Sequence, residues 1–190
     1  MRSVKEVIEI LEKRFEDYPC EKHLKMFVSH AHNLVDQAES ISAHFLQLWG
    51  FQIIDTALLD ECFSQDILNH AHIYTKGVHV VYHSEHFVCG TATLDIRKST
   101  FDLKVHTFDN VTVYGNDCEF FAHNESHIIA GKNSIVKIYD NATVDAGANS
   151  VVFDYSGRNR SVVNKGVILD IKHNRLYVAK GEYQIIEMPQ

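Results

Sequence analysis

The chain has 190 residues, of which 45% are hydrophobic and 23% are charged, a composition typical of a folded domain with its own core. No apolar run reaches the roughly 18 to 20 residues of a membrane span, and the charged, periodic start Met1–Phe15 lacks the apolar middle of a signal peptide. These features predict a cytoplasmic protein and exclude a membrane protein.

The formal charge of -7 is concentrated in the front part of the chain. Residues 1–75 contain six Lys and Arg against twelve Asp and Glu, whereas the other residues contain twelve against thirteen. An acidic surface repels phosphate backbones, so nucleic acid is not an expected partner. The cysteines are scattered without a C-x-x-C pair, which predicts reduced thiols in the core: Cys20, Cys62, Cys89 and Cys118.

The first 77 residues predict a helical segment. Ser3 and Glu6 have the spacing of a capping box, and apolar residues recur at helical spacing up to Phe15. Further helices are expected over about 21–49, 56–63 and 64–70. We do not favour a helix-turn-helix in the last two, because the helix that would contact bases contains no Arg or Lys.

Four consecutive octets span Asn124 to Tyr155, and each has an apolar fifth position and a small third position. The fifth positions are Ile128, Val136, Val144 and Val152; the third positions are Ser126, Ser134, Ala142 and Ser150. Asparagine tolerates left-handed backbone angles and fills the second position of three octets: Asn133, Asn141 and Asn149. The pattern therefore predicts short strands joined by corners at a fixed spacing.

A looser form of the pattern extends back to Gly90. The expected inward residues are Leu94, Leu103, Val113, Phe120, Ile128, Val136, Val144 and Val152. Blocks this short cannot bury a face alone, so they must stack, as the strands of a β-solenoid do. An antiparallel meander is the alternative, but four uninterrupted steps of eight favour the solenoid. Two blocks per turn give about four rungs, or about 20 Å at roughly 4.8 Å per rung.

The expected fold class is α+β, with three parts. A helical N-terminal segment (1–77) precedes a short-rung parallel β-solenoid (78–157), which is followed by a β-rich C-terminal cap (158–190). In the cap, the sequence predicts a β-hairpin that turns at His173-Asn174 and a last strand over Tyr183–Glu187. Such a cap would protect the end of the solenoid from edge pairing.

The segment Tyr139–Ala146 and its neighbours resemble uncharacterised octapeptide-repeat proteins of Bacteroides-like gut bacteria and their phages and mobile elements. The stretch Leu59–Gly77 is similar to the segment that precedes those repeats. The resemblance implies a β-solenoid and an origin on a mobile element, and it assigns no catalytic or binding residues. More distantly, the repeat resembles bactofilins, which are polymer-forming cytoskeletal proteins; bactofilins usually have disordered tails, whereas this chain has a helical front end.

Thirteen histidines raise the question of a metal site. The densest cluster is His79, His83, Glu85 and His86, but on a strand His86 would point away from His79 and His83. The chain has no phosphate-binding loop, dinucleotide fingerprint or G-x-S-x-G motif. We therefore expect no metal, no cofactor and no catalysis.

One outward side of the solenoid is expected to be unusually apolar, because it gathers Phe121, Ile135, Val151 and Phe153. Either the N-terminal helices cover this side, or a second subunit in a homodimer or another protein does. The helical stripe that could cover it contains Leu24, Phe27 and Leu34.

The sequence thus favours a non-catalytic protein-binding module that presents a rigid β-solenoid surface to another protein. The mobile-element resemblance implies one form of this function, an inhibitor of a host or defence protein. A self-assembling scaffold of the bactofilin type and a metal-dependent enzyme are the alternatives.

Overall fold

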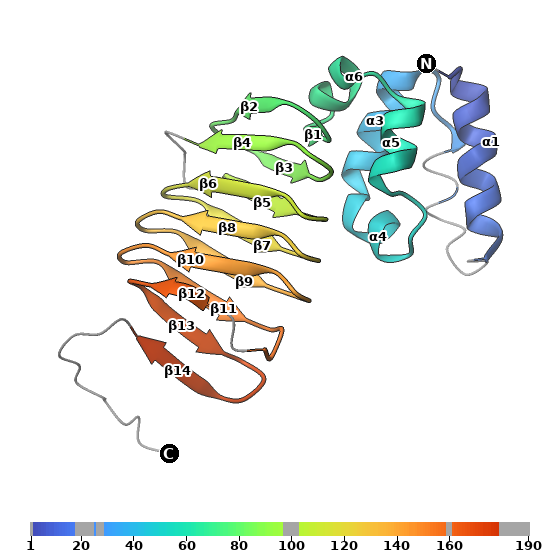
Figure 1. Ribbon diagram of the computed structural model, residues 1–190. Coiled ribbons are helices and arrows are strands. Elements are labelled where there is room, and N and C mark those ends of the chain that lie inside the picture. The colour runs from blue at the N-terminus through green and yellow to red at the C-terminus, as the bar shows by residue number, and fades with distance from the viewer. Residues whose placement is uncertain (1, 18–24, 26–28, 97–102, 159–160, 179–190) are drawn as a thin grey trace.

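The computed structural model describes residues 2–17, 25, 29–96, 103–158 and 161–178. A group of N-terminal helices lies beside one end of a β-solenoid (Figure 1). The helices are α1 (Val4–Arg14), η1 (Phe15–Asp17), α3 (Leu34–Ala43), α4 (Phe45–Gly50), α5 (Thr56–Cys62) and α6 (Gln65–His70).

Local capping sets where these helices begin. The capping box is confirmed, because the Ser3 hydroxyl accepts from the Glu6 N–H and the Glu6 carboxylate accepts from the Ser3 N–H. The prediction of a single helix over 21–49 is wrong in the part of that range that the structure describes. The Asn33 side chain accepts from two backbone N–H groups and starts α3, and the backbone of His44 separates α3 from α4.

The solenoid consists of two sheets, and consecutive strands up to β13 alternate between them, which confirms the expected parallel coil. The eight-stranded sheet contains β1 (Ile73–Tyr74), β3 (Glu85–Val88), β5 (Lys104–Thr107), β7 (Glu119–Ala122), β9 (Ile135–Ile138), β11 (Val151–Asp154), β13 (Val167–Asp170) and β14 (Arg175–Val178). The six-stranded sheet contains β2 (Val78–Val80), β4 (Thr93–Ile96), β6 (Thr112–Gly115), β8 (His127–Ala130), β10 (Thr143–Ala146) and β12 (Ser161–Asn164).

The interior is a stack of apolar side chains in register. All eight residues expected to point inward are buried. In the eight-stranded sheet, however, Val105 rather than Leu103 pairs with Phe120, so the register assigned to Leu103 is wrong. The step from Leu94 to Val113 in the other sheet spans nineteen residues, so this turn is longer than the regular sixteen and its irregular spacing does not locate the inward residue between them.

The solenoid is longer than the sequence indicated, with about five turns rather than four. Parallel pairing begins at β1 and continues to β13, so it passes residue 157, where the cap was expected to begin. An antiparallel pair, β13–β14, turns at the expected place, where Asn174 has φ 52°, but β13 also pairs in parallel with β11, so the hairpin is part of the solenoid sheet and not a separate cap. The strand expected over Tyr183–Glu187 lies outside the described residues.

The corners have left-handed residues 15 or 16 positions apart. At one corner these are Asp109, Asn124 and Asp140, and at the other they are Asp117, Asn133 and Asn149. Asn141, which we expected in this role, is not among them, because the two kinds of corner place the left-handed residue at different positions of the octet. Side chains connect successive corners; for example, the Asn133 amide donates to Asp117 over 2.9 Å.

The described helices contact the first turns of the solenoid. The Phe45 ring of α4 stacks on Phe87 of β3 at 4.4 Å, and Trp49 lies 4.7 Å from Phe108 at the following corner. The Thr56 hydroxyl of α5 donates to Asp109 over 2.6 Å. The later turns extend away from the described helices (Figure 1).

Candidate interaction face

The outward face of the eight-stranded sheet presents two columns of side chains in register. One column runs Lys104, Glu119, Ile135, Val151 and Val167. The other runs His106, Phe121, Lys137, Phe153 and Leu169. The structure therefore brings the expected residues Ile135, Val151 and Phe153 together on adjacent strands.

The described helices leave this part of the face open. Ile135 is 44% exposed, and Phe121, Val151 and Phe153 are half-buried. Of the stripe expected to cover the face, Leu24 and Phe27 lie outside the described residues, whereas Leu34 packs with the other helices.

The face extends further than the sequence indicated, because β13 and β14 belong to the same sheet. Leu176 pairs with Leu169 and is 59% exposed, and Val178 pairs with Val167. We call the resulting set the C-terminal apolar face: Ile135, Val151, Phe153, Val167, Leu169, Leu176 and Val178. The sixteen-residue step from Val152 to Ile168 is the sequence signal that could have found it.

A charged pair bounds the C-terminal apolar face on its N-terminal side. The Lys137 ammonium donates to the Glu119 carboxylate over 2.8 Å and lies 4.6 Å from the centre of the Phe121 ring. The hydrogen bond to Glu119 raises the pKa of Lys137. Because Lys137 lies between Phe121 and Phe153 in the same column, it separates these two rings, whereas Ile135 is a diagonal neighbour of Phe121 on the adjacent strand.

Four stacked rings form a ladder along the adjacent corner: Phe108, His123, Tyr139 and Tyr155. Successive ring centres are 5.0, 4.7 and 5.2 Å apart, and their planes differ by 5° to 7°. Such contacts between neighbouring rings stabilise this corner. Burial, with a smaller effect of nearby His106, lowers the pKa of His123 to about 4.

Buried histidines predict a loss of stability in mild acid. His86 is 5% exposed, and burial lowers its pKa from 6.5 to about 4. The unfolded chain therefore binds the proton more tightly, so stability is full above about pH 6.5 and falls as the pH approaches 4. Between pH 7 and pH 5, His86 should lower the free energy of unfolding of the wild type by about 2 kcal/mol, and we expect His86→Gln to lack this loss.

Urea unfolding at the two pH values measures this difference. The control is His32→Gln, at an exposed position on the helical side of the molecule. An equal loss of stability in wild type and His86→Gln would contradict the assignment to His86.

The four candidate metal ligands make separate local contacts. His79 hydrogen-bonds to the Lys76 carbonyl, His83 to Ser84, and His86 to Tyr74 and the His83 carbonyl. Glu85 accepts from His106 instead. Within the described ranges, no group of three His, Cys, Asp or Glu side chains could hold a metal ion.

Three cysteines are free and buried: Cys62, Cys89 and Cys118. Burial raises the pKa of Cys89 and of Cys118 to about 12, so these thiols are protonated at neutral pH. Cys20 lies outside the described residues.

Comparison of the chain with protein-family models, with curated proteins and with solved structures gives no match. In the part of the chain that the structure describes, no helix has the length and apolar character to cross a membrane. The fold alone therefore defines the class of protein: a two-sheet parallel β-solenoid with a helical N-terminal segment.

Proposed function

We propose that this protein is a non-catalytic protein-binding module, and that the C-terminal apolar face is its binding surface. The supporting observation is the face itself, seven apolar side chains in register on four adjacent strands, with Ile135 44% and Leu176 59% exposed. Single exposed apolar residues are ordinary on protein surfaces, whereas a contiguous group of this kind is typical of an interface.

The surroundings of the face suit a specific partner. The sheet is held by hydrogen bonds on both sides of β9, β11 and β13, so little conformational entropy is lost when a partner binds. Phe153 offers an aromatic anchor inside the face, and Lys137 with Glu119 provides a polar rim at its edge. The resemblance to octapeptide-repeat proteins supports one form of this proposal. In this form, the partner is a host or defence protein, and binding inhibits it.

A self-assembling scaffold is the second candidate, and one observation favours it. β2 and β12 end the six-stranded sheet, and Val78 in β2 is 73% exposed. Pairing of β12 with β2 of another copy would continue the parallel sheet from molecule to molecule. However, α6 lies against β1 at one end and β14 extends the eight-stranded sheet at the other, which opposes such stacking.

The double variant Phe153→Glu with Ile135→Lys tests the proposal, because it replaces two outward side chains and adds no net charge. We expect the variant to fold, since neither side chain belongs to the solenoid core. A protein captured by the wild type is purified, and its affinity for both forms is measured by calorimetry. We expect the affinity to fall about 30-fold or more, the effect of losing an interface anchor.

The matched control is Thr112→Lys with Tyr114→Glu, which makes the same charge changes on the outward side of the six-stranded sheet. This control should bind as the wild type does. Light scattering on the free protein distinguishes the alternatives: a dimer that the Phe153 variant dissociates would make the face a homodimer interface, and filaments would favour the scaffold. Unchanged affinity of the folded double variant would contradict the proposal.

A further inference from the structure

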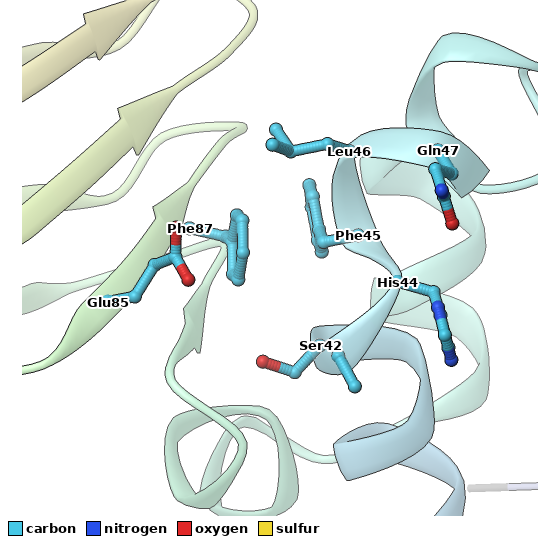
Figure 2. A pocket seen from close by; sticks show the side chains of 8 residues that line it. Ser42, His44, Phe45, Leu46, Gln47, Glu85 and Phe87 are labelled. Carbon is cyan, nitrogen blue, oxygen red and sulfur yellow. The ribbon is translucent and has the colours of Figure 1, made fainter.

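A second surface feature lies at the other end of the molecule, where the helices meet the sheet. A cleft of about 400 Å³ lies between α3, α4 and β3, beside the stacked rings of Phe45 and Phe87. The side chains of Ser42, Phe45 and Leu46 extend toward Phe87 and Glu85, whereas His44 and Gln47 extend to the opposite side of the helix (Figure 2). This volume lies within the range of roughly 300–1,000 Å³ that small-ligand sites have.

The lining of the cleft is mixed: Ala43, Phe45, Leu46 and Phe87 are apolar, whereas Ser42, His44, Gln47 and Glu85 are polar. Phe45 and Phe87 stack on each other, so their ring edges border the space, and Leu46 is 44% exposed at its mouth. Glu85 supplies a carboxylate whose side chain is 52% exposed. The site therefore offers the apolar surface of Leu46 and Phe87 for a short aliphatic stem and one anion for its end.

The imidazole of His106 does not cancel the charge on Glu85, although Lys104 lies opposite Glu85 in register on β5. The His106 Nε2–H donates to the Glu85 carboxylate over 2.8 Å, and His106 Nδ1 is buried without a hydrogen-bond partner among the described residues. A second proton on this ring would leave a buried N–H donor unsatisfied, which disfavours the imidazolium. Burial likewise lowers the pKa of His106. The pair is thus a carboxylate with a neutral imidazole.

The rest of the groove adds a second carboxylate, Glu39, which lies 3.3 Å from His70 Nε2. A second hollow of about 290 Å³ shares Ser42 and Ala43 with the cleft and is lined further along by Glu39, His70 and His72. The residues that line the two hollows include two carboxylates and no Lys or Arg. Residues 1–75, which supply most of the walls, have six more acidic than basic side chains. The groove is therefore complementary to a cation.

We propose that the cleft binds an arginine side chain of the partner protein, with the guanidinium on the free edge of the Glu85 carboxylate and the methylene stem against Leu46 and Phe87. The inference rests on the proposed protein-binding function, although it concerns a different surface. Arginine is favoured over lysine because its planar guanidinium can bind a carboxylate through two N–H groups and is less strongly hydrated.

The probe for this site is acetyl-arginine-amide, and acetyl-citrulline-amide is its uncharged counterpart of nearly the same shape. Titration of the isolated protein is followed by NMR of the backbone amides and by the fluorescence of Trp49, the one tryptophan of the chain, which stacks on Phe45. We expect the arginine probe to shift resonances of β3 and α4, and the citrulline probe to bind about tenfold more weakly or worse.

Two variants locate the site. Glu85→Gln keeps an acceptor for His106 but removes the charge, and we expect at least about a tenfold loss of probe affinity. Leu46→Lys places a cation at the mouth of the cleft and should have a similar effect without touching the Glu85–His106 pair. The matched control is Glu125→Gln at a solenoid corner, which should bind like the wild type.

Equal binding of the two probes, or wild-type affinity in both Leu46→Lys and Glu85→Gln, would overturn the assignment of the cleft. This experiment uses no partner protein, so its failure is distinct from a failure of the proposed function. Conversely, probe binding that survives Phe153→Glu with Ile135→Lys would show that the cleft acts independently of the C-terminal apolar face.

Discussion

The variant Val136→Asp should be largely unfolded at 25 °C. Val136 is fully buried, and its neighbours in the column are Phe120 and Val152 on the adjacent strands. A carboxylate at this position has no cationic partner within the apolar stack, so it must be desolvated or protonated. We expect a loss of about 4 kcal/mol or more, comparable with the entire stability of many domains.

Circular dichroism and urea unfolding measure this loss. The control is Lys132→Asp at an exposed corner four residues earlier, where a surface substitution should change the free energy of unfolding by about 0.5 kcal/mol or less. A folded Val136→Asp protein with wild-type stability would mean that the side chain is not inside the solenoid.

The second large effect is expected from Gly147→Ala, in the corner after β10. A Cβ at Gly147 would lie 2.5 Å from the Gly131 carbonyl oxygen and 2.7 Å from that of Ala130. Both contacts are with backbone, so relief requires separation of β8 and β10, and the 2.7 Å hydrogen bond from Gly147 to Ala130 would be lost. We expect a destabilisation of about 3 kcal/mol.

Gly50→Ala is the matched control, because a Cβ there meets no atom within 4 Å. Its position at the end of α4 favours alanine over glycine, so this variant should be as stable as the wild type or slightly more stable. Thermal unfolding of both variants gives the comparison. Similar melting temperatures would show that the stacked turns can separate at this corner without cost.

The solenoid could be predicted where the repeat is regular. Between Asn124 and Tyr155 the sixteen-residue turn has no insertion, so the alternation of each octet gives both the strand and its inward residue. At Leu103 the same count fails, because the turn before it contains additional residues and the hydrogen bonds of the sheet place Val105 in the column. Periodicity thus determines register only while the corners have equal length.

The candidate surfaces could be predicted less well, because they depend on contacts between distant residues. The octet pattern brought Ile135, Val151 and Phe153 together, since their placement follows from strand alternation alone. It did not show that Lys137 lies over Phe121, and it did not include Leu176, which reaches the face through an antiparallel turn. The cleft depends on the contact between Phe45 and Phe87, which no local pattern specifies.

Because the turn repeats, the number of turns sets the distance between two surfaces of the solenoid. The cleft lies beside β3 near one end, and the C-terminal apolar face begins at β9, with β5 and β7 between them in the same sheet. Each turn contacts only its neighbours, so a sixteen-residue unit could be gained or lost without rebuilding either surface. One such event would change their separation by about 4.8 Å. Gain or loss of turns during evolution could therefore match the distance between the two surfaces to the distance between two binding points on a partner.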